Sequence, residues 1–296
     1  MKNMTTKWML AAVLVLLTAC EKAYDDQSVV IDEGKNDRGN VTLRVVNLEM
    51  MPFSNVTLTK ATGDVGNVCS HLNIAVFQND EKVSSVNQKE GDQGFGTVSM
   101  NLPTGTYDLV VIAHNSTGSA TISSPSKITF PSNIITDTFY YYGQLTVGSQ
   151  AQTVDISLTR AVAMYRLNIT DDMPNGVDNM KFYYTGGSST FDATTGFGNV
   201  NSRQTVNIGI TSDMKGKPST FEVYTFPHQE TGTLKMTVTA EDSQKAKVME
   251  RVFEDVPIQR NVITQMSGEF FSGSASGQAI TLQADDAWAG LNELTY

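Results

Sequence analysis

The sequence has few of the residues that build most enzyme active sites. Its 296 residues include only two cysteines and three histidines, and the histidines (His71, His114 and His228) are far apart in the chain. There is no HExxH motif, no G-x-S-x-G motif and no glycine-rich loop joining a strand to a helix. These absences argue against a zinc protease, an α/β hydrolase and a nucleotide-binding domain. We therefore expect a protein with no catalytic activity, no cofactor and no metal site.

Basic residues and helical patterns are also scarce. The chain carries 21 Lys and Arg against 31 Asp and Glu, for a formal net charge of -10. Proteins that bind nucleic acid need a basic surface, so nucleic acid is excluded as a partner. No amphipathic pattern continues long enough to predict a helix. Val, Thr, Ile, Tyr and Phe instead recur in short runs between turn residues, which is typical of β-strands.

The N-terminus carries a short apolar run. Lys2 and Lys7 precede the apolar residues Trp8–Leu17, which are too few to span a bilayer. The run ends in Leu-Thr-Ala-Cys at Cys20, which is similar to the lipobox of bacterial lipoproteins. The resemblance implies that residues 1–19 are a signal peptide and that Cys20 is the lipidated first residue of the mature protein. The alternatives are an ordinary signal peptide with a chance cysteine, or a buried apolar helix.

Residues 20–40 are predicted to be a tether. This segment is rich in Asp and Glu and has no extended apolar periodicity, so we expect it to lift the folded part away from the membrane. With Cys20 lipidated, only Cys69 is left, and one thiol cannot form an intrachain disulfide. Cys69 directly precedes an apolar strand, so we expect it to be a small buried hydrophobic residue.

Two consecutive sets of short strands follow. The clearest strands of the first set are His71–Gln78, Tyr107–Ala113, Ile122–Phe130, Thr138–Leu145 and Val154–Leu158. The second set contains Ala161–Thr170, Phe221–Phe226, Thr233–Ala240 and Lys247–Phe253. Short alternating strands spaced by turns predict an all-β fold with two β-sandwich domains, at residues 41–160 and 161–272. Residues 273–296 form a C-terminal extension.

Three motifs in a fixed order carry a family resemblance. They are C-x-x-L-x-I-x-V-F at Cys69–Phe77, L-P-x-G-x-Y-x-L-V at Leu102–Val110, and V-x-I-x-L-x-R-x-V-A at Val154–Ala163. Behind a lipobox and an acidic tether, this order resembles the fimbrillin-like proteins of the Bacteroidales, particularly the fimbrillin-A-associated anchor lipoproteins. The resemblance covers Val41 to Gly273. It implies two consecutive transthyretin-like β-sandwich domains, export to the outer membrane, and assembly by a strand passed between subunits.

The resemblance gives a functional expectation. It implies a non-catalytic, lipid-anchored fimbrial subunit or anchor that faces outward from the outer membrane, binds fimbrial subunits and supports cell adhesion. The main alternative is a surface lipoprotein that binds glycan or a host protein without polymerising. A hydrolase is a more distant third, because nothing in the sequence distinguishes a catalytic pair of carboxylates from an acidic surface.

The resemblance also marks two arginines. Fimbrillin-like stalk subunits are cut after an arginine near the first strand, and Arg38 and Arg44 are the candidates in this chain. The alternative is an ordinary linker arginine and an ordinary strand arginine. An anchor that keeps its lipid must stay joined to Cys20, so we expect neither arginine to be cut.

The C-terminal extension has the parts of a donated strand. Its start is rich in Ser and Gly, Ala279–Gln283 can extend as a strand, and Trp288 offers a large apolar side chain. We expect the extension to join a neighbouring subunit by strand exchange, with Ile280 and Leu282 filling pockets of a groove. The alternative is a final strand that folds into its own sandwich, with Trp288 capping the core.

Overall fold

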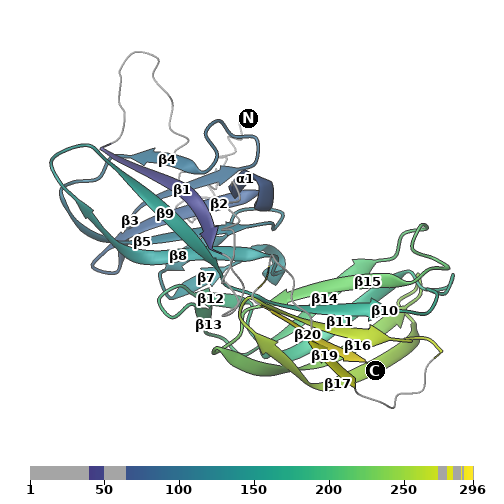
Figure 1. The fold of residues 1–296 in the computed structure, drawn as a ribbon. Coiled ribbons are helices and arrows are strands. Elements are labelled where there is room, and N and C mark those ends of the chain that lie inside the picture. Colours follow the sequence, from purple (N-terminus) through teal and green to yellow (C-terminus); the bar gives the residue numbers. More distant parts are fainter. Residues whose placement is uncertain (1–39, 50–64, 273–278, 283–287, 289, 296) are drawn as a thin grey trace, which may run out of the picture. The chain divides into compact units, whose positions relative to one another are not determined.

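The computed structural model describes residues 40–49, 65–272, 279–282, 288 and 290–295 (Figure 1). The predicted signal peptide and all but the last residue of the tether, including Cys20 and Arg38, lie outside these ranges. The described residues form strands and loops, with one four-residue helix, α1 (Val65–Val68), and one 3-10 turn, η1 (Pro131–Asn133). Within this part of the chain, no helix is long and apolar enough to span a membrane. The prediction of an all-β fold is confirmed.

Seven strands make up the first β-sandwich. They are β1 (Val41–Glu49), β2 (His71–Gln78), β3 (Glu81–Lys89), β4 (Thr97–Met100), β5 (Gly105–His114), β8 (Thr138–Val147) and β9 (Gln152–Arg160). Their order is β3-β2-β5-β8-β9-β1-β4. However, β8 and β9 share only two residue pairs, Phe139 with Arg160 and Tyr140 with Thr159. The sheet is therefore divided into a layer of four strands and a layer of three. Alternate residues of both layers, such as Leu43 and Val111, form one buried core.

The second β-sandwich repeats this topology strand for strand. Its strands are β10 (Ala163–Ile169), β11 (Asn179–Gly187), β14 (Ser202–Gly209), β15 (Ser219–Thr225), β16 (Thr231–Glu241), β17 (Lys247–Gln259) and β18 (Val262–Gly268). β10 is parallel to β18 and antiparallel to β15, just as β1 is parallel to β9 and antiparallel to β4. β11 lies between β14 and β16, as β2 lies between β3 and β5. The prediction of two consecutive transthyretin-like β-sandwiches is thus confirmed.

A small bridging sheet joins the two sandwiches. β6 (Thr121–Ser124) and β7 (Lys127–Thr129) are inserted between β5 and β8, and β12 (Thr190–Asp192) and β13 (Phe197–Gly198) between β11 and β14. The inserts pair with each other, with Ile128 opposite Phe191. Arg38 to Tyr296 form one compact unit, so the independence of the domains at 41–160 and 161–272 stays a prediction. The strand predicted at Ile122–Phe130 is wrong: the chain turns at Pro125, which has no N–H to continue a ladder.

Two further strands extend the second sandwich. β20 (Gly290–Thr295) runs parallel to β18, and β19 (Ala279–Leu282) pairs antiparallel with β20. The resulting sheet has the order β15-β10-β18-β20-β19. In the first sandwich the corresponding side of β9 is paired only with β8, over the two residue pairs at its end. In this structure the C-terminal strands therefore pair within their own chain.

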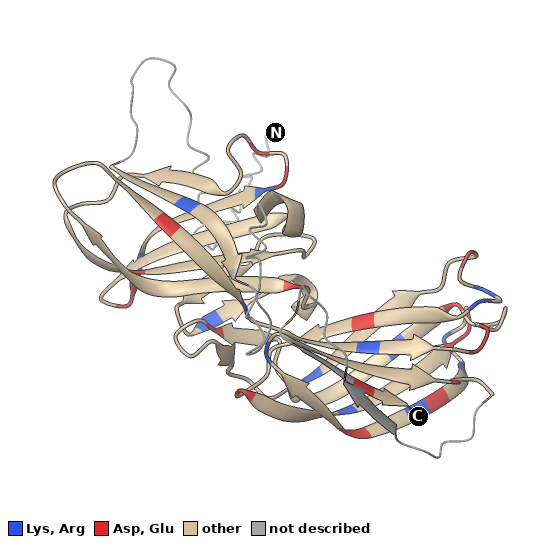
Figure 2. Cartoon of the chain, in the orientation of Figure 1, with Lys and Arg blue, Asp and Glu red and all other residues tan. Residues whose placement is uncertain are grey.

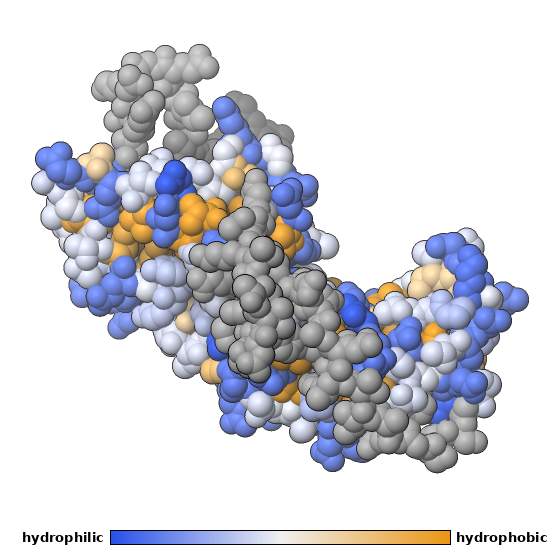
Figure 3. All heavy atoms as spheres, in the orientation of Figure 1, coloured by the Kyte–Doolittle hydropathy of each residue, from blue (hydrophilic) through white to orange (hydrophobic). Residues whose placement is uncertain are grey.

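Charged residues are distributed over the strands and turns (Figure 2). Among the described residues, Arg160 and Glu241 are the only Lys, Arg, Asp or Glu side chains in the buried class. On the face drawn in Figure 3, hydrophobic residues gather over the first sandwich. Because burying a charge is costly unless it is paired, the surroundings of Arg160 and Glu241 are candidate functional sites.

Candidate functional site

Arg160 ends β9 and is 3% exposed. Its Nε and Nη2 donate to the two carboxylate oxygens of Asp137, at 2.8 and 3.0 Å. Its Nη1 donates to Oδ1 of Asn261, in the turn between β17 and β18, at 2.9 Å. The first sandwich thus supplies the cation and its counterion, and the second sandwich supplies an amide. These bonds satisfy the charge of the guanidinium and fix its plane.

Both aromatic neighbours of this guanidinium are buried. Its central carbon lies 3.9 Å from the ring centroid of Trp288 and 4.7 Å from that of Phe139. The ring centroid of Trp288 lies 6.3 Å from that of Tyr224 on β15. Burial raises the pKa of Tyr224, and the charges of Glu222 and Asp137 add to this increase. We call Arg160, Asp137, Phe139, Asn261 and Trp288 the Arg160 junction.

The junction borders a third hydrophobic core. Trp288 belongs to this core together with Phe226 and Ile263 of the second half and Ile128 and Phe130 of the first. The bridging sheet contributes Phe191, whose ring centroid lies 4.9 Å from that of Phe226. The C-terminal extension therefore contributes its tryptophan to the core that joins the two sandwiches.

The start of the extension is fixed separately by Asp171. Its Oδ1 accepts a hydrogen bond from the N–H of Phe270 at 2.8 Å, and its Oδ2 accepts from those of Phe271 and Ser272 at 2.8 and 2.9 Å. The Ser272 hydroxyl donates to the same Oδ2 at 3.1 Å. Burial acts to raise the pKa of Asp171, but the hydrogen bonds from Phe270, Ser272 and Phe271 together lower it below its usual value. The carboxylate therefore anchors the last described residues before the extension.

The other predicted site residues lie elsewhere. Arg44 lies on β1, where it is half exposed and pairs with Asp155 of β9 at 2.7 Å. Ile280 and Leu282 lie on β19, opposite Leu294 and Asn292 of β20. Of the two sequence candidates whose side chains the structure describes, Arg44 and Trp288, it is Trp288 that belongs to the Arg160 junction.

Cys69 does not have the environment of a reactive thiol. It is 2% exposed, and burial raises the pKa of its thiol, with the charge of Asp137 adding to the effect. A buried thiol that resists ionisation is a poor nucleophile. The geometry agrees with the expectation that Cys69 is a small hydrophobic core residue.

A pair of stacked histidines is not indicated by any pattern in the sequence. The rings of His71 on β2 and His114 on β5 are stacked, with centroids 5.3 Å apart. His114 is fully buried: its Nε2 donates to Oδ1 of Asn73 at 2.8 Å, and its Nδ1 accepts from the N–H of Ser116 at 3.0 Å. Burial, with a smaller contribution from His71, lowers the pKa of His114 to about 4. The pair could have been found only by aligning β2 with β5, because the two residues are direct ladder partners.

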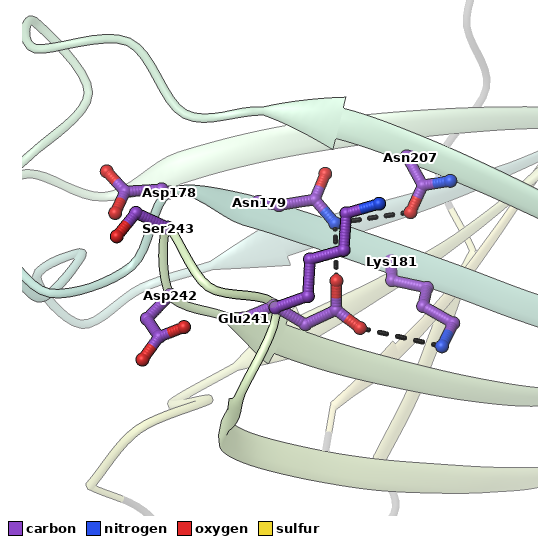
Figure 4. A pocket seen from close by; sticks show the side chains of 8 residues that line it. Asp178, Asn179, Lys181, Asn207, Glu241, Asp242 and Ser243 are labelled. Atoms are coloured by element: carbon purple, nitrogen blue, oxygen red, sulfur yellow. Dashed lines mark hydrogen bonds and ion pairs between the residues drawn. The ribbon is translucent and has the colours of Figure 1, made fainter.

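Glu241 lies in a polar pocket of about 480 Å³ on the second sandwich (Figure 4). Its Oε2 accepts a hydrogen bond from Asn179 Nδ2 at 2.9 Å, and its Oε1 lies 3.5 Å from Lys181 Nζ. Asn179 Nδ2 also donates to Asn207 Oδ1 at 3.2 Å. The remaining lining residues are Asp178, Asp242, Ser243 and Lys245. No His, Cys, Asp and Glu group within the described ranges has the arrangement of a metal site.

Comparisons with known proteins identify the family. Residues 33–255 match the model of the fimbrillin-A associated anchor proteins Mfa1 and Mfa2. The chain belongs to this family. The resemblance drawn from the three sequence motifs is confirmed, and membership places the chain among fimbrial anchor proteins of the cell surface, a family that associates with fimbrial subunits. No curated protein matches the chain in sequence.

Solved structures of low sequence identity are also similar. The fimbrial anchor protein Mfa2 of Porphyromonas gingivalis is 10% identical, with a TM-score of 0.40 over 71% of this chain and 80% of that one. A fimbrial assembly protein from Parabacteroides distasonis is 12% identical, with a TM-score of 0.40 over 81% and 93%. A protein from Bacteroides ovatus described as an adhesin is 11% identical, with a TM-score of 0.48 over 71% and 75%.

Proposed function

We propose that this protein is a non-catalytic, lipid-anchored fimbrial subunit or anchor at the outer membrane that donates its C-terminal strands to a neighbouring subunit. The observation that carries the proposal is the repeated topology. The first sandwich is built from seven strands, and the second contains the same seven strands plus β19 and β20. The two additional strands can therefore leave without removing any strand that the shared architecture uses.

The physical basis of the exchange is strand addition. An incomplete sheet edge in a neighbour presents unpaired N–H and C=O groups, which an extended segment satisfies. β20 makes such a ladder with β18 in its own chain, so the same backbone groups can pair with a neighbour. Residues two positions apart in an extended strand point to the same side, so Ile280 and Leu282 of β19 would suit successive pockets of a neighbour's groove.

Truncation tests this donation. A chain ending at Gly273 retains the seven strands of the second sandwich and should fold, but it should no longer co-purify with fimbrial subunits. Circular dichroism and thermal unfolding check the fold. A truncated protein that unfolds, or that associates as the full chain does, contradicts the assignment of the extension as the connector.

The lipid at Cys20 is the proposed attachment to the membrane. Several acyl chains add about 0.8 kcal/mol per buried methylene, which holds a protein durably at a bilayer. Cys20→Ala should therefore move the protein to the soluble fraction or stall it as an uncleaved precursor. Cys69→Ala is the matched control and should partition as the wild type does, since Cys69 is a buried core residue. Membrane partitioning of Cys20→Ala equal to that of the wild type, with its signal peptide removed, would refute the attachment.

The proposed anchor keeps its first strand. Cleavage after Arg38 or Arg44 would separate the folded part from Cys20, so we expect both bonds to stay intact. In support, Arg44 lies in the ladder of β1, opposite Thr97 of β4 and Asp155 of β9, where a protease cannot bind it in extended form. Mass spectrometry of assembled protein tests this. A mature N-terminus at Gly39 or Val45 would identify a stalk subunit instead.

The proposed orientation is outward from the cell. The acidic segment 20–40 would carry the sandwiches beyond the headgroups without binding anionic lipids. Protease treatment of intact cells should therefore degrade both sandwiches. Full protection of the sandwiches in intact cells, with degradation only after lysis, contradicts outward display.

The polar pocket favours a second candidate function, binding of a glycan. Its volume of about 480 Å³ is in the range of small-molecule sites, and its amide, ammonium and carboxylate groups can pair with sugar hydroxyls. Asn179 and Lys181 are already bonded to Glu241, which makes this candidate weaker than the first. A glycan array with wild-type protein and Asn179→Ala tests it. Glycan binding that the substitution abolishes would establish the second function, and an array without signal would exclude it.

A further inference from the structure

We propose that Trp288 is a latch that holds the C-terminal strands on their own sandwich, with the Arg160 guanidinium as its seat. The proposal rests on the proposed donation of these strands and adds a mechanism that controls their release. The hairpin β19–β20 would leave only when Trp288 leaves the Arg160 junction. The joint between the two sandwiches would thus set how readily the strands are released.

Groups other than Trp288 orient the Arg160 guanidinium. Asp137 and Asn261 together accept three hydrogen bonds from the Arg160 guanidinium, which orient its plane. Phe139 covers the cation at 4.7 Å and Trp288 at 3.9 Å. Arg160 is 3% exposed and Trp288 is 6% exposed, so the cation–π contact is shielded from water. A cation–π contact is stronger when it is desolvated.

The hydrogen bonds of β20 and the contact of Trp288 differ in what replaces them when the C-terminal strands are released. The hydrogen bonds between β20 and β18 can be replaced by equivalent bonds to water or to a neighbour's edge, so they favour the stored position only weakly. The contact of Trp288 with Arg160 exists only in the stored position. Leu294 is the one other described side chain of the extension that is buried. Trp288 therefore contributes a large share of what distinguishes the stored from the released hairpin.

Release also changes the joint. Trp288 belongs to the third core with Ile263 and Met164, so its departure removes a wall of the core that joins the sandwiches. Conversely, any rearrangement of the joint that moves Arg160 breaks its contact with Trp288. The position of the hairpin and the packing of the joint are thus linked through one contact.

Hydrogen exchange of the isolated protein tests the latch without a partner. The full chain would carry Cys20→Ala to make it soluble, and the amides of β20 (Gly290–Thr295) would be compared with those of β5 (Gly105–His114). Trp288→Ala should speed hydrogen exchange in β20 by about 30-fold, the factor that corresponds to the loss of a desolvated cation–π contact. The exchange rates in β5 should be unchanged. Trp288→Phe should have a smaller effect in the same direction. Unchanged protection of β20 in Trp288→Ala overturns the proposal.

A double-mutant cycle checks that Arg160 is the seat. Arg160→Lys keeps the charge but loses the planar stacking face, so it should also speed exchange in β20. If the two residues act through one contact, the double variant Arg160→Lys/Trp288→Ala exchanges no faster than Trp288→Ala alone. Additive effects overturn the assignment of Arg160 as the seat. Val147→Ala, in the core of the first sandwich, is the control and should speed exchange in β5 but not in β20.

Association with fimbrial subunits separates the latch from the donation on which it rests. Arg160→Lys leaves Trp288 intact and should associate faster than the wild type. Faster exchange in β20 without association of any form of the protein, wild type included, leaves the latch standing and refutes the donation. Association of the wild type that Arg160→Lys does not accelerate, although β20 exchanges faster, refutes control by the latch and leaves the donation standing.

Discussion

The guanidinium of Arg160 lies 3.9 Å from the ring centroid of Trp288. Arg160 ends the last strand of the first sandwich, and Trp288 belongs to the C-terminal extension beyond the second. One contact therefore connects the joint between the sandwiches with the segment that we propose to be donated.

Removal of the Arg160 side chain should destabilise the protein strongly. Arg160→Ala leaves the carboxylate of Asp137, which is 17% exposed, without its bidentate partner. Breaking a buried ion pair from one side costs about 3 kcal/mol or more, which chemical denaturation would measure as a lower free energy of unfolding. Arg44→Ala is the matched control, since its pair with Asp155 is half exposed and worth less than about 1 kcal/mol. Equal losses for the two variants would contradict the structural importance of the junction.

Stability should fall in mild acid because of His114. Burial lowers the pKa of this side chain from 6.5 to about 4, so between these pH values the unfolded chain binds a proton that the folded chain does not. The free energy of unfolding is thus highest above pH 6.5 and should decrease by about 3 kcal/mol as the pH falls to about 4.

The control for this pH dependence is His114→Gln. The variant lacks the titrating ring, so its stability should change less than that of the wild type between pH 6.5 and 4. Denaturation curves at several pH values give the difference between the two proteins. If that difference is constant across the range, His114 is not the responsible group.

The anchor at the start of the extension should depend on the carboxylate of Asp171. Asp171→Asn replaces one acceptor oxygen by an N–H₂ group that faces the N–H donors of Phe270, Phe271 and Ser272. We expect the free energy of unfolding to fall by about 1 kcal/mol and hydrogen exchange at residues 270–272 to accelerate. Exchange rates at these amides equal to those of the wild type would show that the carboxylate does not hold them.

Cys69 should be unreactive in the folded protein. Its thiol is 2% exposed and burial raises its pKa, so iodoacetamide should modify it only after denaturant unfolds the chain. Mass spectrometry of the alkylated protein measures this. Rapid alkylation of Cys69 under native conditions would show that the first sandwich opens at α1 and β2.

Much of the fold follows from local sequence patterns. Strand β2 was predicted within its observed limits, His71–Gln78, because its apolar alternation is bounded by the turn residues Asn79 and Asp80. The strands at Tyr107–Ala113 and Val154–Leu158 lie inside β5 and β9 for the same reason. Sequence patterns of this kind show which residues face a core, so two consecutive sets of them also predict two consecutive sandwiches.

The junction could not be predicted in this way. The sequence marks Trp288 as a large apolar residue and Arg160 as part of a family motif at the domain boundary, but no local pattern links a strand end to a distant extension. The bridging strands β12 and β13 are three and two residues long, too short to show an alternation. Their existence depends on pairing with β7, a contact between the two halves of the chain.

The most direct test of strand donation is a reversible lock on the C-terminal hairpin. Gln265 of β18 and Glu293 of β20 are ladder partners whose side chains are hydrogen bonded at 2.9 Å, so cysteines at both positions can form a disulfide that holds β20 in place. In a Cys20→Ala background, only the buried Cys69 remains as a competing thiol. The measurement is co-purification of this variant with fimbrial subunits, before and after reduction. We expect no association in the oxidised protein and recovery of association in the reduced protein. Equal association in the two states would contradict it.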